Sequence, residues 1–199
     1  MKFFFLIYFV SFPLAAQTYA EVESYIETIR STYRPQVFEG DKEPTTLASS
    51  SDQKNIFLGV DSDKDGVRDD LEVFINRNFK YDYEREIYKE IARKSAFALK
   101  QDIDKKSREE LQQIMSSIYD AQTCFTYLIQ YNYMKNTNEY RNRQFVVLSL
   151  VFSGQERQDY WHKYMSKARS FGTDADTGEK KFSYCPKYIK KMYPFPKKN

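Results

Sequence analysis

The residues whose types and spacing best fit a definite chemistry are the acids of a twelve-residue stretch, 61–72. Carboxylates stand at positions 1, 3, 5, 9 and 12 of this stretch, and glycine stands at position 6. A hard divalent cation such as calcium takes about six to eight oxygen ligands, so the chain that binds it must wrap around one point and turn alternate side chains inward. Gly66 stands where the sharpest turn is needed, and a residue with a Cβ would resist that turn. The stretch therefore predicts a calcium site.

The position of each residue in the stretch assigns it a role. The predicted metal ligands are Asp61, Asp63, Asp65, the backbone carbonyl of Val67, Asp69 and Glu72. Asp69 would act directly or through a water, and Glu72 would close the coordination sphere with both oxygens. Aspartate and glycine also favour ordinary solvated turns. Five carboxylates in one loop repel one another unless a cation neutralises them, and a plain turn has no need of that arrangement.

The string D-x-D-x-D-G-V-x-D resembles the calcium loops of the EF-hand superfamily, and more closely thrombospondin type 3 repeats and other bacterial surface calcium loops. Most EF-hands place an apolar residue at position 8, where this chain has Arg68 and its apolar residue is Val67. Residues 49–60 show no clear helical period, so we expect a loop followed by a helix. A second acidic segment, 173–179, lacks the later ligands and is expected to be a surface loop. A single site argues against a cooperative calcium sensor.

The N-terminus predicts export. Met1 and Lys2 precede an apolar run at 3–14, which is the make-up of a secretory signal peptide. Ala16 and Ala20 each end a plausible cleavage site, and the apolar run is too short to span a bilayer comfortably. We therefore expect residues 1–20 to be a signal peptide and residues 21–199 to form one helical domain in the periplasm or outside the cell.

The two cysteines fit an oxidising compartment. Cys124 and Cys185 are predicted to form a disulfide, which would stabilise the fold by about 4 kcal/mol in the chain-entropy model. The alternative is two free buried thiols. Their spacing does not suit zinc, and His162 is the only histidine.

The helical period predicts an all-α fold, a single domain of about five to six helices with the calcium loop preceding one of them. The expected helices are 21–34, 70–78, 83–101, 107–129, 136–152 and 155–171. Pro35 should end the first, Ser107 and Glu110 form a capping box at the start of the fourth, and Gly154 should end the fifth. Residues 35–51 are rich in Pro, Thr, Ser, Glu and Asp and are expected to be a loop or linker.

The C-terminal segment 180–199 is strongly basic, with seven lysines and no acid. Such a segment suits an anionic envelope surface or an envelope protein as partner. Because the protein is expected to be exported, we do not expect it to bind nucleic acid. The alternative is a solvated tail pinned by Cys185, which we favour because Pro186, Pro194 and Pro196 prevent a continuous amphipathic helix.

No catalytic signature is present, and we expect no enzyme activity. His162 has no nucleophile motif beside it, and Glu139 with Glu156 is one acid pair among many.

The whole chain resembles a group of uncharacterised exported bacterial proteins that combine a signal peptide, one such loop and a helical body. The stretch Asn136–Glu139 with Arg141, and Ser153–Gly154, carry that likeness. The resemblance implies calcium binding and export. The expected function is a calcium-stabilised binding module of the cell envelope; the alternative is a small envelope hydrolase using a carboxylate pair.

Overall fold

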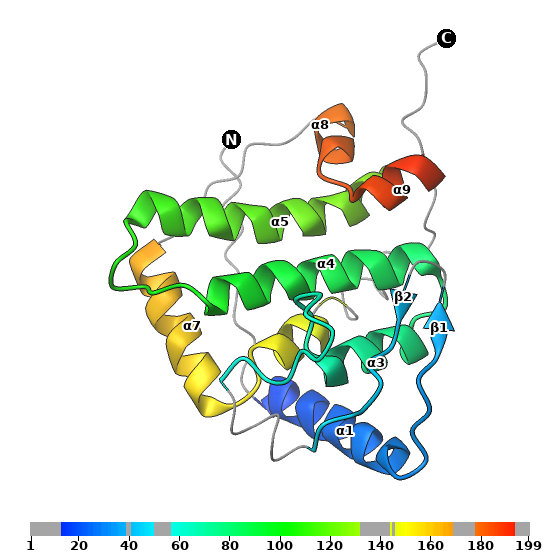
Figure 1. Ribbon diagram of the computed structural model, residues 1–199. Helices are drawn as coiled ribbons and strands as arrows, with labels where there is room; N and C mark the ends of the chain where they lie inside the picture. Colours follow the sequence, from blue (N-terminus) through cyan, green and yellow to red (C-terminus); the bar gives the residue numbers. More distant parts are fainter. Residues whose placement is uncertain are drawn as a thin grey trace.

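A computed structural model describes residues 13–38, 41–49, 57–131, 144, 146–168 and 178–193. Its elements are α1 (Pro13–Arg30), β1 (Val37–Phe38), β2 (Asp41–Lys42), α3 (Asp69–Asn78), α4 (Asp82–Leu99), α5 (Arg108–Gln130), α7 (Gln155–Ala168), α8 (Gly178–Ser183) and α9 (Lys187–Met192). Residues 146–151 are also helical. The two strands form a short antiparallel hairpin. The predicted all-α single domain is confirmed (Figure 1).

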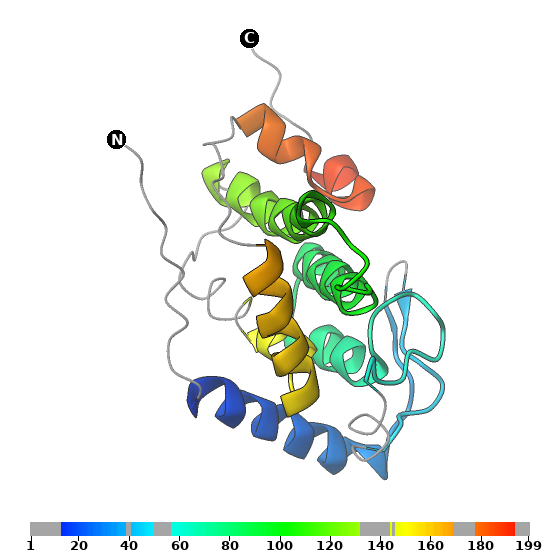
Figure 2. The same cartoon turned by 90° about the vertical axis from the view of Figure 1, so that its left-hand side faces the viewer.

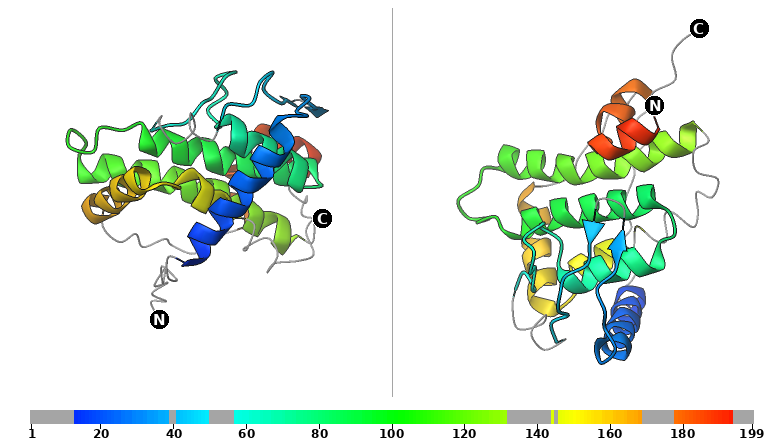
Figure 3. Two further views of the ribbon diagram at one scale, coloured as in Figure 1. Left: turned by 90° about the horizontal axis from the view of Figure 1, so that it is seen from below. Right: turned by 45° about the vertical axis from the view of Figure 1, so that its right-hand side comes forward.

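The helices are stacked in layers. From one end to the other the order is α8 with α9, then α5, α4, α3 and α1, and α7 packs across α4 and α5 (Figures 1 and 2). The acidic stretch enters α3 from a loop that lies beside the hairpin on one face of this stack (Figures 2 and 3). The loop therefore leads into α3, which packs against α1 on one side and α4 on the other.

The apolar stripes expected from the sequence build the core. Ile75 of α3, Ile87 and Ile91 of α4, and Phe125 and Leu128 of α5 are all fully buried in the main cluster. A second cluster joins the end of α4 and the start of α5 to α7. In that cluster the hydroxyl of Tyr164 donates to the carbonyl of Leu111 at 2.6 Å, which satisfies a buried polar group.

The capping box at the start of α5 is confirmed. The hydroxyl oxygen of Ser107 accepts the N–H of Glu110 at 3.1 Å, and the carboxylate of Glu110 accepts the N–H of Ser107 at 2.8 Å. Two donors that a helix start leaves without intrahelical partners are thereby satisfied. Near the other end of α5, Cys124 forms a disulfide with Cys185.

Residues 35–51 were predicted to be a loop or linker, and the described part is largely loop that packs against the helices and does not form a free linker. Glu43, Pro44 and Leu47 are buried. The Glu43 carboxylate accepts two hydrogen bonds from the Arg77 guanidinium of α3, at 2.9 and 2.7 Å, and one from the N–H of Gln36 at 3.0 Å. A buried ion pair to a helix more than thirty residues away leaves no trace in local composition.

The favoured prediction of a solvated C-terminal tail at 180–199 was wrong for residues 180–193, the part that the structure describes. Cys185 and Ile189 are buried, and the ring of Phe182 lies 5.0 Å from that of Tyr127 on α5. Pro186 does interrupt the helix, as expected, and the segment forms α8 and α9 on either side of it. Gly178 and Glu179, predicted to be surface loop, begin α8. The lysines at 197 and 198 lie outside the described residues.

Helix boundaries differ from the predictions mainly at the N-terminus. α1 begins at Pro13, ahead of both predicted cleavage sites, and ends at Arg30, four residues before the predicted end. Tyr33 instead turns inward, and its hydroxyl donates to the carbonyl of Pro44 at 2.8 Å. Tyr25 and Ile26, which pack against the core, follow both cleavage sites.

The fifth predicted helix is described only in part. Position 144 and residues 146–151 are helical, and Gly154 follows with a φ of +91°, as a helix-ending glycine should. The predicted cap at 136–139 lies outside the described residues. Within the described part of the chain, no helix has the length and apolar character needed to cross a bilayer.

Candidate metal centre

The acidic loop is fixed at the start of α3 by backbone contacts. The N–H of Asp69, the first residue of α3, donates to the carbonyl of Val60 at 2.8 Å and so closes the loop at its base. The side chain of Val67 is fully buried in the main core. The apolar residue at position 7 therefore anchors the loop to the helical stack.

Three of the predicted ligands come together. Asp61, Asp63 and Asp65 each offer a carboxylate oxygen, and these oxygens lie within 4.8 Å of one another. Oxygens that bind the same calcium ion at about 2.3–2.6 Å lie at most about 5 Å apart. The spacing thus fits a shared calcium ion without any movement of the backbone.

Backbone N–H groups inside the loop hold one oxygen of each of these carboxylates. Asp61 Oδ2 accepts from Gly66 at 3.1 Å, Asp63 Oδ1 from Asp65 at 3.1 Å, and Asp65 Oδ1 from Val67 at 2.7 Å. The other oxygen of Asp61, Oδ1, is buried and has no hydrogen-bond partner among the described residues. A buried, unsatisfied carboxylate oxygen is costly, and a cation at this point would satisfy it. The residues present therefore fit calcium.

The electrostatics of Asp61 agree with this geometry. Burial raises the pKa of its carboxyl, the hydrogen bond from Gly66 lowers it, and the charges of Asp65 and Asp63 raise it further, so that the net shift is upward. The protein thus disfavours the charged form of Asp61 when no cation is near. A bound divalent ion would reverse that preference.

Glycine is required at position 6 for two reasons. Gly66 has a φ of +91°, a left-handed conformation that side chains with a Cβ rarely adopt. A Cβ at this position would also lie 2.9 Å from Cγ of Arg93. Arg93 of α4 therefore packs directly against the turn.

Arg93 is a contact that the sequence analysis missed. Its Nε donates to the carbonyl of Asp65 at 2.7 Å, and Nη2 donates to Asp65 Oδ2 at 2.9 Å. This clamp joins the loop to α4 and supplies a positive charge beside the three carboxylates. A separation of 28 residues carries no signal in a single sequence.

Asp69 and Glu72, the last two predicted ligands, do not belong to the carboxylate group that the described residues form. Asp69 is fully buried, and its two oxygens accept from the N–H of Ser62, at 2.8 Å, and from the Ser62 hydroxyl. Burial raises the pKa of Asp69 although both of these hydrogen bonds lower it. Glu72, also fully buried, forms an ion pair with Lys89 of α4, with Oε1 and Nζ 3.1 Å apart.

Arg68, the departure from the EF-hand pattern at position 8, has a structural role here. Its side chain is 7% exposed, and its guanidinium pairs with both oxygens of Asp70 at 2.5 and 3.1 Å. It also donates to the carbonyl of Leu150 at 3.3 Å. In place of an apolar contact to a second loop, this loop has an arginine contact to the helical residues 146–151.

Two of the residues considered for catalysis, Glu156 and His162, lie on α7. Glu156 is exposed on α7, and its proposed partner Glu139 lies outside the described residues. His162 is exposed on α7 as well.

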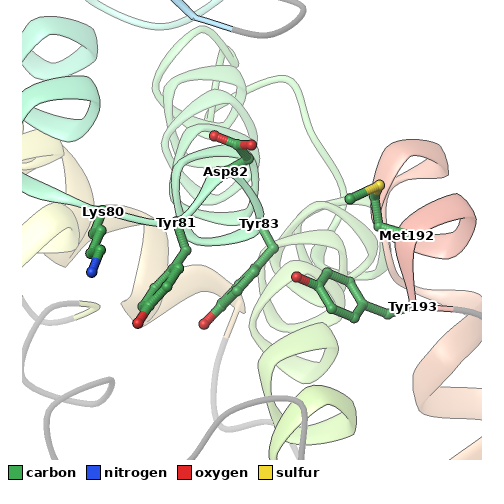
Figure 4. A pocket seen from close by; sticks show the side chains of 6 residues that line it. All are labelled: Lys80, Tyr81, Asp82, Tyr83, Met192 and Tyr193. Carbon is green, nitrogen blue, oxygen red and sulfur yellow. The ribbon is translucent and has the colours of Figure 1, made fainter.

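A shallow hollow marks a second surface, where the connection between α3 and α4 meets the end of α9. It has a volume of about 170 Å³ and is lined by Lys80, Tyr81, Asp82, Tyr83, Met192 and Tyr193. Tyr81 and Tyr83 stack with ring centroids 5.3 Å apart, and Tyr193 meets Tyr83 edge-on at 5.4 Å (Figure 4). Tyr81 and Met192 are about half exposed. Met192, which lines the hollow, directly follows Lys190 and Lys191 at the end of α9.

No protein-family model, no curated protein and no solved structure matches this chain.

Proposed function

We propose that this protein is an exported calcium-binding module whose single EF-hand-like loop holds a structural calcium ion. The observation that carries the proposal is the gathering of Asp61, Asp63 and Asp65 within 4.8 Å around the buried, unsatisfied Oδ1 of Asp61. Three carboxylates at this spacing repel one another, and a divalent cation offsets that repulsion.

Calcium at this point would stabilise the junction between several helices. The loop leads into α3, Arg93 joins it to α4, and Arg68 joins it to the helical residues 146–151. Because the ion binds the folded loop, it raises the free energy of unfolding by RT ln(1 + [Ca]/Kd), about 2.7 kcal/mol at a hundredfold excess over Kd. Extracellular sites of this kind have Kd values of about 10⁻⁴ to 10⁻³ M.

Export is part of the same proposal. A positive start and a short apolar run at the N-terminus support it, and so does the disulfide between Cys124 and Cys185, a bond typical of oxidising compartments. A site of millimolar affinity also requires the calcium concentrations found outside the cytoplasm.

The proposed partner is an anionic envelope surface that contacts the C-terminal face. Lys187 and Lys191 are exposed on α9, and Lys80 lies across the tyrosine hollow from Met192 (Figure 4). Lysines attract anionic headgroups or phosphorylated glycans by about 1 kcal/mol each, and exposed tyrosine and methionine side chains suit an interfacial position. Vesicles of phosphatidylglycerol should sediment the wild-type protein, whereas phosphatidylcholine vesicles and a Lys187→Glu/Lys191→Glu variant should give no cosedimentation.

The calcium proposal is tested by thermal unfolding in calcium and in EDTA. Calcium should raise the Tm of the wild-type protein, and the Asp61→Asn/Asp63→Asn variant should lose that rise. Asp102→Asn is the matched control, because Asp102 is an exposed aspartate outside the loop, and it should respond as the wild type does. A Tm that does not depend on calcium up to millimolar concentrations would refute the proposal.

A further inference from the structure

We infer that Lys89 sets the calcium affinity of the loop by competing with the ion for Glu72. This inference rests on the proposed calcium site and adds the residue that tunes it. Lys89 lies on α4, outside the twelve-residue stretch, and its ammonium group is 3.1 Å from Glu72 Oε1.

Glu72, the twelfth residue of the stretch, lies in the first turn of α3. Its N–H donates to the carbonyl of Arg68 at 2.9 Å, so the helix fixes its backbone. Its carboxylate is nevertheless paired with Lys89 and does not belong to the group formed by Asp61, Asp63 and Asp65. To bind the ion, Glu72 would have to turn its carboxylate away from Lys89.

Both members of this ion pair are buried, with side-chain exposures of 3% for Lys89 and 0% for Glu72. Two buried opposite charges attract each other strongly, and separating them exposes each to the cost of burial without its partner. Calcium must meet that cost when it takes Glu72 from Lys89. The apparent Kd is the intrinsic Kd divided by the fraction of molecules in which Glu72 is available.

Arg93 does not have the same effect, although it too is a cation beside the loop. Its side chain is 36% exposed, and it contacts Asp65, whose Oδ1 also accepts from Val67. Solvent screens this interaction more than it screens the buried pair, so Arg93 competes less strongly with the ion than Lys89 does. The buried pair is therefore the affinity-setting contact, and its ammonium group preserves charge balance around Glu72 when no calcium is bound.

The test is calcium titration calorimetry on Lys89→Met. Removing the competing cation should tighten calcium binding on the order of tenfold. Without calcium, the Tm of Lys89→Met should be lower than that of the wild type. Calcium should restore it, because the ion then balances the charge of Glu72 in place of the ammonium group. Lys94→Met is the matched control: Lys94 lies on the same helix, is 40% exposed and pairs with Glu90 at 3.5 Å, so its affinity should equal that of the wild type.

Two further variants keep the inference testable if Lys89→Met does not fold without calcium. Glu72→Gln should bind calcium more weakly than the wild type. The double variant Glu72→Gln/Lys89→Met carries neither buried charge and should show the weak affinity of Glu72→Gln. Equal or weaker binding by Lys89→Met, or unchanged binding by Glu72→Gln, would overturn the inference while leaving the calcium site in place. No binding by the wild-type protein would instead refute the proposed function itself.

Discussion

The ion pair between Glu43 and Arg77 provides a strong test of the fold, because it holds a segment that composition predicts only to be a loop or linker. The Glu43 side chain is fully buried and receives three hydrogen bonds, two from Arg77 and one from the N–H of Gln36. Arg77 also lies over the ring of Tyr33, at 5.1 Å from its centroid, and donates to the carbonyl of Arg34 at 2.9 Å. Arg77→Met removes the charge that balances Glu43.

The expected loss follows from burial. Removing one partner of a buried ion pair costs about 3–5 kcal/mol, because the other charge stays buried without compensation. Arg77 is 14% exposed, so we expect the lower end of that range. For a chain of this length each kcal/mol shifts Tm by about 2–4 °C, which gives a fall of about 10 °C. Adding Glu43→Gln to Arg77→Met should recover at least half of the lost Tm. A neutral amide at position 43 can still accept a hydrogen bond from the N–H of Gln36.

Calorimetric melts and urea unfolding of the two variants measure these differences. Lys105→Met is the control, because Lys105 forms an exposed pair with Asp102, and its Tm should equal that of the wild type. If Arg77→Met had the same Tm as the control Lys105→Met, segment 41–49 would not be docked on α3. If the double variant were as unstable as Arg77→Met, the lost charge balance would not be the cause.

Three further predictions concern the disulfide, two of the left-handed glycines and the partly buried Tyr160. The disulfide links Cys124 and Cys185, 61 residues apart, so reduction should lower the free energy of unfolding by about 4 kcal/mol; a urea midpoint unaffected by reductant would contradict this. Gly66→Ala and Gly154→Ala place alanine at the same φ of +91°, which costs about 1–2 kcal/mol in each. Gly66→Ala should lose more in urea unfolding, because only there does the new Cβ meet a neighbour within 4 Å, and equal losses would argue against the packing at the loop. The Tyr160 hydroxyl donates to two backbone carbonyls, and burial raises its pKa to about 12. The stability that it contributes is present below the unfolded pKa of about 10 and is lost as pH rises through about 12, so Tyr160→Phe should flatten the alkaline fall of the urea midpoint; an unchanged fall would refute this.

Much of the fold could be predicted because it depends on local patterns. The apolar period located α3, α4, α5 and α7 to within a few residues, and the capping box placed the start of α5. Contacts between distant segments were not predictable in this way. The docking of Glu43 on Arg77, and of Ile189 against the core, depends on tertiary packing that composition does not record.

The same division applies to the metal centre. Alternating aspartates in a tight turn come together by loop geometry alone, and Asp61, Asp63 and Asp65 do so. The two later acids are held by partners that the spacing does not reveal, Ser62 for Asp69 and Lys89 for Glu72. Local spacing therefore predicts where an ion would sit, and the surrounding helices decide which acids are ready to bind it.

Calcium titration calorimetry on residues 21–199 tests the central claim most directly. We predict one calcium ion per chain, with a Kd of about 10⁻⁴ to 10⁻³ M. The Asp61→Asn/Asp63→Asn variant should release no binding heat, whereas Asp102→Asn should bind as the wild type does. No binding heat from the wild-type protein at millimolar calcium, or undiminished binding by the loop variant, would contradict the assignment of this loop as a calcium site.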